Sequence, residues 1–171
     1  EDPVEYQLPR INQVQVNHRI DLGFARVLRT ALRLDPDIIL VGEMRDMETG
    51  EIGLRAALTG HLVLSTLHTN TAAGAITRLE DMGVERYLIT SSVNGVLAQR
   101  LVRRLCPECK EPFDPDHDDV PADFPWEKLD GKALYKAVGC RTCRGVGYAG
   151  RMGIYELLVT TEKIRDLANE R

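Results

Sequence analysis

Residues 34–46 read LDPDIILVGEMRD, and this stretch decides the fold class. Its centre, residues 38–41 (IILV), is an apolar run without polar alternation, which is typical of a parallel strand covered on both faces. Pro36 ends any helix that comes before it, and Gly42 permits a sharp turn just ahead of Glu43. The stretch therefore predicts a buried central strand that presents an acidic residue at its carboxyl end.

The segment before this strand has the pattern of an amphipathic helix over residues 23–35. Apolar side chains recur at positions i, i+3 and i+4 and form one face, while three arginines fall on the opposite face. The apolar positions are Phe24, Val27, Leu28, Ala31 and Leu32, and the arginines are Arg26, Arg29 and Arg33. The periodicity predicts a helix that stops before Pro36.

After this strand the chain continues to alternate helical patterns with short apolar runs. We expect helices over residues 48–59, 72–82 and 85–92, and a second buried strand over residues 62–64. Thr71 is placed to cap the second of these helices, and Gly60 and Gly83 follow the first and second. Such alternation predicts an α/β domain with a parallel sheet.

The last third of the chain changes in composition. Residues 96–105 (VLAQRLVRRL) fit an alternating strand and an amphipathic helix equally well, so their structure stays open. Residues 106–150 hold all four cysteines and five of the eight prolines, residues 152–159 return to a strand pattern, and Thr161 is placed to cap a last helix. We therefore predict a main domain formed by residues 1–105 and 151–171, with residues 106–150 inserted into it.

The whole chain has 171 residues, 43% of them apolar, and a formal net charge of -4. A chain of this length buries roughly 70% of the surface that its unfolded form exposes, so disorder is excluded as a description of the whole. No apolar run approaches the roughly 18 residues of a membrane span, and no leader-like segment opens the chain, which predicts a soluble cytoplasmic protein. Since the chain begins at Glu1 without a methionine, we expect it to be part of a longer protein.

The four cysteines form two C-x-x-C pairs separated by thirty residues: Cys106 with Cys109, and Cys140 with Cys143. Four thiolates make a closed tetrahedral zinc site with a structural role. Disulfides are disfavoured in a reducing cytosol, and a thioredoxin-like redox site uses a single pair. We predict one structural Zn²⁺; the alternatives are four incidental buried thiols or a catalytic metal.

Three polar residues are expected to meet at one edge of the sheet. A buried strand that ends in an acidic residue is what a nucleotide triphosphatase uses to hold Mg²⁺ or orient the attacking water. The alternative is that Glu43 is an ordinary surface carboxylate. The second strand, however, ends in Thr66 and His68, and ligands gather outside the carboxyl ends of parallel strands. We therefore expect Glu43, Thr66 and His68 to converge.

The arginine face of helix 23–35 has two interpretations. It is a solvated stripe, or it contacts phosphate or a neighbouring subunit, for which the planar guanidinium is well suited. Arg19, just ahead of that helix, has the same two interpretations. The chain contains no G-x-x-x-x-G-K-[ST] loop, so a nucleotide-binding function requires a phosphate-binding loop upstream of Glu1. It also lacks the G-x-S-x-G, H-E-x-x-H and G-x-G-x-x-G motifs.

Several long motifs, in the same order, closely resemble the secretion ATPase superfamily. They are EDPVE (1–5), FARVLRTALRLDPDIILVGEMRD (24–46), TGHLVLSTLHTNTA (59–72), LAQRLVRRLCPECK (97–110), CRTC (140–143) and GYAGRMGIYELL (147–158). The nearest members are type II secretion ATPases, with type IV pilus assembly ATPases next. The resemblance implies part of a RecA-like core with a mostly parallel sheet, and an inserted zinc-binding subdomain.

The resemblance also implies roles for individual residues. EDPVE is similar to an Asp box, whose acidic residues place Mg²⁺ and water, so Glu1 comes first, with Asp2 and Glu5 after it. DIILVGE resembles a Walker B motif and makes Glu43 the acidic residue nearest the metal or water. TGHLVLSTLHT resembles a His box, which implies that His61 and His68 act on the γ-phosphate side beside Thr66. The matching arginines, which face nucleotide or a neighbouring subunit, are Arg19, Arg26, Arg29 and Arg33.

As a whole, the resemblance implies a homo-hexameric, Mg²⁺-dependent ATPase that hydrolyses ATP to power pseudopilus assembly in type II secretion. Its expected location is the cytoplasm, attached to the inner membrane through secretion platform proteins, including the cytoplasmic domain that anchors the ATPase. The 171 residues alone are expected to be inactive because they lack the phosphate-binding loop. The first alternative is a pilus assembly ATPase. The second is a zinc-ribbon module for nucleic acid, which the slightly acidic balance and the stretch 114–119 (DPDHDD) oppose.

Overall fold

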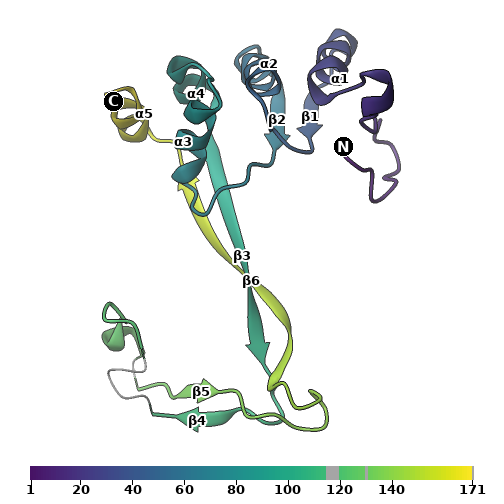
Figure 1. The fold of residues 1–171 in the computed structure, drawn as a ribbon. Helices are drawn as coiled ribbons and strands as arrows, with labels where there is room; N and C mark the ends of the chain where they lie inside the picture. Colours follow the sequence, from purple (N-terminus) through teal and green to yellow (C-terminus); the bar gives the residue numbers. More distant parts are fainter. Residues whose placement is uncertain (115–119, 130, 171) are drawn as a thin grey trace. The chain divides into compact units, whose positions relative to one another are not determined.

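The computed structural model describes residues 1–114, 120–129 and 131–170 (Figure 1). The chain divides into two compact units, and each is described by itself. Unit 1 consists of residues 1–98 and 156–171, and unit 2 consists of residues 99–155. The predicted insertion, 106–150, falls within unit 2, and its exact limits stay a prediction. Most of the acidic stretch at 114–119 lies outside the described residues.

Unit 1 contains a short parallel sheet. Strand β1 (Ile38–Val41) pairs with β2 (Leu62–Ser65), and the register places Ile38 opposite Leu62 and Val41 opposite Ser65. Helix α2 (Met47–Leu58) connects the two strands. Because the strands run in the same direction, the residues that follow Val41 and Ser65 come together at one edge of the sheet.

The two helices nearest β1 form where the sequence predicts them. Helix α1 (Phe24–Ala31) continues as a 3-10 turn (Leu32–Leu34), which confirms the helix expected over residues 23–35. At the start of α2, the Asp46 carboxylate accepts a hydrogen bond from the Thr49 N–H at 2.8 Å. Gly60, just past the end of α2, has a φ of +106°, a conformation that glycine adopts without strain.

Three further helices complete unit 1: α3 (Gly74–Asp81), α4 (Arg86–Ser92) and α5 (Glu162–Asn169). Helix α3 begins two residues later than predicted, and Ala73 rather than Thr71 is its N-cap, although the Thr71 hydroxyl accepts a hydrogen bond from the Gly74 N–H at 3.1 Å. Thr161 is the residue that precedes α5, although its side chain makes no capping hydrogen bond.

The prediction that both strands are buried on both faces is wrong for the described residues. In β1, Ile39 and Val41 are 8% and 5% exposed, but Ile38 and Leu40 are 62% and 61% exposed. In β2, Leu62 and Leu64 are likewise exposed. The physical reason is that helices α1 and α2 cover only one side of this two-stranded sheet (Figure 1). An apolar run without alternation therefore does not ensure that both faces are covered within one chain.

The core of unit 1 lies between the covered face and the helices. One cluster of buried side chains joins α1, β1 and α2, and a second joins α2, α3 and α4. The first consists of Leu28, Ile39, Val41, Met44 and Ala56, and the second of Leu54, Leu79, Val84, Leu88 and Ile89. The first cluster holds the end of β1 in place and thus supports the residues that follow it.

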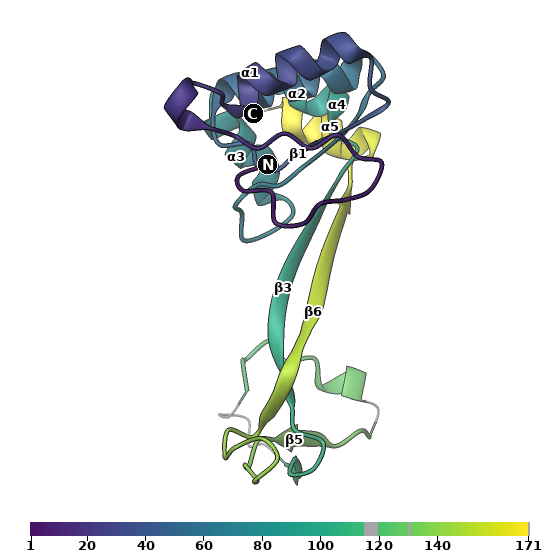
Figure 2. The same cartoon turned by 90° about the vertical axis from the view of Figure 1, so that its right-hand side faces the viewer.

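The remaining strands form two small sheets. Strand β3 (Gly95–Leu105) pairs with β6 (Tyr148–Val159), and the two lie side by side in both views (Figures 1 and 2). Residues 96–105 are thus a strand, because pairing with β6 decides what periodicity left open. Strand β4 (Glu111–Phe113) pairs antiparallel with β5 (Leu134–Lys136), and a 3-10 turn (Trp126–Leu129) lies between them in sequence.

The α/β class is confirmed, but the sheets are small. The described residues form three two-stranded sheets, of which β1–β2 is parallel and β4–β5 antiparallel. A mostly parallel sheet is therefore confirmed only in part, and the residues that the structure describes do not form a full RecA core. None of the helices in the described part of the chain is long and apolar enough to cross a membrane.

Candidate functional site

The loops after β1 and β2 are joined by hydrogen bonds at the carboxyl edge of the sheet. The Thr66 hydroxyl donates to the Gly42 carbonyl at 2.7 Å, and the Met44 N–H donates to the Thr66 carbonyl at 3.2 Å. The Met44 side chain is buried in the core cluster beneath. These contacts fix the backbone from which Glu43 and His68 project.

Both carboxylate oxygens of Glu43 have a partner. Oε1 lies 3.0 Å from Nε2 of His68, and Oε2 accepts a hydrogen bond from Nε of Arg45 at 2.6 Å. The Glu43 side chain is 15% exposed, while those of Arg45 and His68 are 56% and 87% exposed. The hydrogen bond that Arg45 donates to Glu43, reinforced by the charges of Glu43 and Asp2, raises the pKa of Arg45. The carboxylate is thus the most enclosed member of the group.

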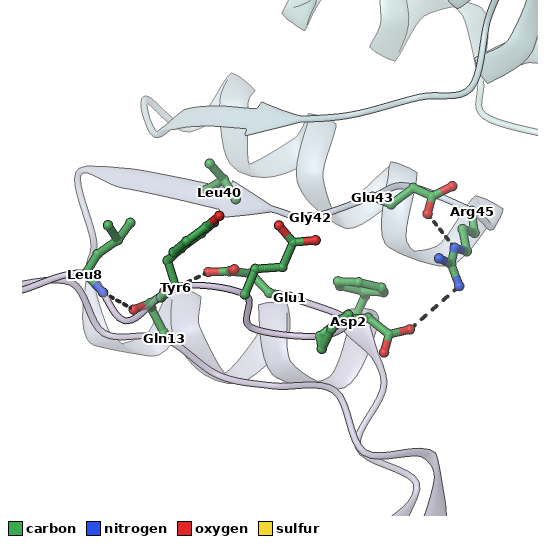
Figure 3. A pocket seen from close by; sticks show the side chains of 12 residues that line it. Glu1, Asp2, Tyr6, Leu8, Gln13, Leu40, Gly42, Glu43 and Arg45 are labelled. Atoms are coloured by element: carbon green, nitrogen blue, oxygen red, sulfur yellow. Dashed lines mark hydrogen bonds and ion pairs between the residues drawn. The ribbon is translucent and has the colours of Figure 1, made fainter. Parts of the chain in front are cut away.

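The N-terminal segment brings further carboxylates to this edge. Asp2 lies 3.7 Å from Nη1 of Arg45, and the Glu1 carboxylate accepts a hydrogen bond from the Gln13 side chain at 2.9 Å. A cavity of about 330 Å³ opens between this segment and the end of β1 (Figure 3). Its lining includes Glu1, Asp2, Glu5, Tyr6, Phe24, Gly42, Glu43 and Arg45. The cavity is therefore bordered by four carboxylates and one guanidinium.

The structure brings together most, but not all, of the residues that the sequence singled out. Glu43, Thr66 and His68 converge as expected, and Glu1 lies on the same cavity as Glu43. His61 does not join them, because it precedes β2 and so lies at the opposite edge of the parallel sheet. Its Nδ1 is instead 3.0 Å from the Ala56 carbonyl, at the end of α2.

The four candidate arginines lie away from the cavity lining. Arg26 donates to the Asp21 carbonyl at 3.1 Å, and Arg29 pairs with Glu48 at the start of α2. Arg33 lies in the 3-10 turn after α1, and Arg19 lies in a 3-10 turn over His18–Ile20. Their proposed contacts with nucleotide or a neighbouring subunit stay predictions.

Sequence reasoning missed Arg45. Its signal was present in the motif GEMRD, where Arg45 follows Glu43 by two positions. In an extended segment, residues two apart point to the same side, and the one between them points to the other. Here Met44 enters the core, so Glu43 and Arg45 lie together on the outer side.

The second candidate site is the cysteine cluster of unit 2. The sulfur atoms of Cys106, Cys109, Cys140 and Cys143 all lie within 4.8 Å of one another. The Sγ–Sγ distance is 3.9 Å for Cys106–Cys140 and for Cys109–Cys143, and 3.7 Å for Cys140–Cys143. A tetrahedral site with Zn–S bonds of about 2.3 Å requires sulfurs about 3.8 Å apart. The observed spacing fits a zinc ion.

Two tight turns place these thiols. In the first, the Lys110 N–H donates to the Cys106 carbonyl at 3.0 Å, and in the second, the Gly145 N–H donates to the Cys140 carbonyl at 2.8 Å. Backbone N–H groups also point at sulfur: Gly139 donates to Sγ of Cys109 at 3.3 Å, and Gly147 to Sγ of Cys143 at 3.2 Å. Such donors stabilise thiolates, which are the form that binds metal.

The same hydrogen bonds separate the acidities of the metal-free thiols. The N–H of Cys140, with help from that of Gly147, lowers the pKa of Cys143 to about 6. The N–H of Cys143 similarly lowers the pKa of Cys140. Desolvation dominates at Cys109 and raises its pKa to about 11. The four sulfurs lie within 4.8 Å of one another, and two of the thiols are made more acidic, so they form a metal-binding cluster that suits zinc.

The chain belongs to the family of type II/IV secretion system proteins, whose family model matches residues 1–171. The resemblance to secretion ATPases that the motifs indicate is thereby confirmed. A match over the whole chain also favours this assignment over a zinc-ribbon module for nucleic acid.

Individual relatives agree with this assignment. The chain is 55% identical over 167 residues to the type II secretion system ATPase E of Vibrio cholerae, covering 98% of this chain and 33% of that protein. It is also 55% identical over 166 residues to the type IV pilus assembly ATPase PilB of Thermus thermophilus, covering 96% of this chain and 19% of that protein. The chain therefore spans a third or less of the length of these two relatives.

A solved structure shares the fold. The pilus retraction motor PilT, crystallised with bound ADP, matches with a TM-score of 0.67 at 34% identity, covering 99% of this chain and 40% of that one. The α/β fold and the cysteine cluster thus belong to a homologue of secretion ATPases.

Proposed function

We propose that this chain is part of an ATPase that powers protein transport in type II secretion. It contributes the carboxylate edge, which is formed by Glu1, Asp2, Glu5 and Glu43 at the end of β1, and the zinc-binding cysteine cluster of unit 2. In the full-length protein, Mg²⁺-dependent hydrolysis of ATP by water drives pseudopilus assembly, within a homo-hexamer held at the inner membrane by platform proteins. The observation that carries the proposal is the position of Glu43, enclosed at the end of β1 between His68 and Arg45 and beside the N-terminal carboxylates.

The residues at this edge suit phosphoryl transfer to water. Glu43 is placed to accept a hydrogen bond from the attacking water, because a carboxylate offers about four lone-pair sites and only two are occupied here. Glu1 and Glu43 are the groups that would hold Mg²⁺, which neutralises phosphate charge when bound. Thr66 holds the two loops together, and His68 faces solvent on the side where the γ-phosphate would lie.

The remaining assignments are parts of the same proposal. Arg19, Arg26, Arg29 and Arg33 would act from a neighbouring subunit of the hexamer, which accounts for their absence from the cavity lining of their own chain. Strands β1 and β2 with α1 and α2 would form part of a RecA-like core, and the cysteine cluster would hold a structural Zn²⁺. The bound ADP of the related motor PilT supports a nucleotide as ligand.

A pilus assembly ATPase is the second candidate, since the Thermus thermophilus PilB matches this chain at the same 55% identity as the Vibrio cholerae secretion ATPase. The two share a mechanism and differ in their partners. Co-purification with the inner-membrane proteins of each system would separate them.

The test of the ATPase function is Glu43→Gln in the full-length protein. The amide keeps the shape but removes the negative charge, so we expect MgATP to bind and turnover to fall by about 100-fold or more, as for other positioned acid–base groups. Glu51→Gln is the matched control, since Glu51 also pairs with an arginine, on the exposed side of α2. Unchanged kcat for Glu43→Gln would make Glu43 an ordinary surface carboxylate.

A further inference from the structure

Glu156 joins the last strand of the chain to the loop that carries His68. Its Oε2 accepts a hydrogen bond from the Ala72 N–H at 3.1 Å, across 84 positions of sequence. Glu156 lies in β6, whereas Ala72 lies in the loop between β2 and α3, four residues after His68. Both residues belong to unit 1. The proposed hydrolysis uses His68 and gives Glu156 no part.

The Ala72 N–H depends on this carboxylate. Ala72 is 0% exposed, so water does not reach its N–H. Because Ala72 precedes α3, that helix offers its N–H no acceptor. A buried N–H that loses its acceptor carries the full cost of desolvation. We therefore expect the loop to move when the carboxylate is removed, until water reaches this N–H.

The loop between β2 and α3 is held at both ends. At its start, the Thr66 hydroxyl donates to the Gly42 carbonyl at 2.7 Å, and near its end the Ala72 N–H bonds to β6. His68 lies between these anchors and is 87% exposed, so packing gives its side chain little support. The 3.0 Å contact between Nε2 of His68 and Oε1 of Glu43 thus depends on where the loop backbone is held.

A second side chain at the start of α3 serves only the helix. The Thr71 hydroxyl accepts a hydrogen bond from the Gly74 N–H at 3.1 Å. Thr71 is exposed and Gly74 is half-buried, so water can replace this hydroxyl. Loss of the Thr71 acceptor therefore weakens the start of α3 without forcing the loop to move.

We propose that Glu156 is a positioning residue, which holds the loop after β2 so that His68 stays against Glu43 at the edge of the sheet. This inference rests on the proposed function of that edge. A misplacement of about 1 Å can reduce the rate of a reaction by about 100-fold. Loss of the Glu156 acceptor should therefore lower kcat, while the binding of MgATP, which depends on other groups, should change little.

The test compares Glu156→Leu with Glu156→Gln in the full-length protein. Leucine has no acceptor, so we expect kcat to fall by about 10-fold or more, with KM for ATP changed less than about threefold. Glutamine keeps a carbonyl oxygen that can accept from the Ala72 N–H, so it should retain kcat within about threefold of wild type.

A double variant tests whether Glu156 acts through His68. His68→Ala alone should lower kcat, because it removes the side chain that the loop positions. In the His68→Ala background, Glu156→Leu should change kcat by less than about twofold, since residues that act as a unit are non-additive.

Thr71→Ala is the matched control, since it removes the other acceptor at the same helix start. It should lower the melting temperature but keep wild-type kcat. Hydrogen exchange of residues 66–73 reports the loop directly, and it should be faster in Glu156→Leu than in Glu156→Gln or wild type. If Glu156→Leu does not fold, Glu156→Asp, whose carboxylate is one methylene shorter, must show the lowered kcat at unchanged KM by itself.

The outcomes separate this inference from the proposed function. Wild-type kcat in Glu156→Leu, an equal loss in Glu156→Gln, or the same loss with and without His68 overturns the role of Glu156 alone. An equal fall of kcat in Thr71→Ala would mean that weakening of α3 is the cause, and would also overturn it. Full turnover in His68→Ala overturns the proposed role of His68, and the inference falls with it, whereas Glu43→Gln tests the ATPase function separately.

Discussion

The carboxylate edge of unit 1 and the cysteine cluster of unit 2 both gather groups that bind cations, but they are built differently. The cluster presents four sulfurs within 4.8 Å of one another, three of the pairs at 3.7 to 3.9 Å, all supplied by two tight turns. The edge presents carboxylates from segments far apart in the sequence, beside an open cavity of about 330 Å³. A closed set of equal ligands serves the fold, whereas an open set with unused lone pairs can receive a substrate.

Removal of the metal is the strongest test of this difference between the two sites. We expect about one zinc per chain at Zn–S distances of about 2.3 Å. Its chelation should loosen residues 106–150 and spare unit 1, because structural zinc contributes on the order of 10 kcal/mol only to the segment that it ties together. Elemental analysis and hydrogen exchange before and after chelation measure this. A preparation without zinc, or equal loss of protection in unit 1, contradicts the closed-site interpretation.

The carboxylate edge should neither bind ATP tightly nor hydrolyse it without a phosphate-binding loop. The 171 residues offer a triphosphate mainly side chains, and several of those at the cavity are anionic. We expect the folded, zinc-loaded chain to show no measurable ATPase activity and to bind MgATP no more tightly than about millimolar, or about 4 kcal/mol. Calorimetry decides this. Micromolar binding by these residues alone would show that the edge suffices for affinity.

Adding one methyl group to a glycine of a cysteine turn should weaken zinc binding without changing any metal ligand. Gly147 has a φ of +75°, donates its N–H to Cys143, and would place a Cβ 2.7 Å from that of Ala137. Gly147→Ala should therefore lower the stability of the zinc site by about 1–3 kcal/mol. Competition with a chelator measures the change in zinc affinity.

Gly145→Ala is the control for that variant. Gly145 has a similar φ of +80°, but a Cβ there meets no atom within 4 Å. Gly145→Ala should lower the stability of the zinc site only by the strain of a left-handed alanine, about 1 kcal/mol. Equal losses for the two alanines would mean that the close approach of Gly147 to Ala137 does not matter.

The smallest expected effect is on the number of protons that zinc binding releases. Because the pKa of Cys143 is lowered to about 6, this thiol is already ionised at about pH 7.5, whereas Cys109, whose pKa is raised to about 11, still carries its proton. Zinc binding to the metal-free chain should release fewer than four protons at about pH 7.5, and the number should rise as the pH falls below about 6. Calorimetry in buffers of different ionisation enthalpy counts them. A pH-independent release of four protons would contradict the lowered pKa of Cys143.

Local sequence determined much of this protein. The spacing of the four cysteines indicated one tetrahedral cluster, because thiolates have few other uses in such a pattern. The helices around residues 24–34, 47–58 and 86–92 follow from apolar periodicity and end signals, which act over a few residues. The order of strand, glycine and Glu43 likewise indicated that a carboxylate would lie at the carboxyl end of β1.

Other features depended on which segments pair in space. The apolar run of β1 indicated burial on both faces, yet only Ile39 and Val41 are covered, since coverage depends on where α1 and α2 pack. His61 and His68 look alike in one motif, but the direction of β2 puts them at opposite edges of the sheet. The contact of Arg45 with Glu43 could be recognised only from the structure, because it depends on the Met44 side chain entering the core. Periodicity shows which face of a segment can be buried. Only the tertiary structure decides which other segment packs on that face, and which of the remaining side chains come into contact.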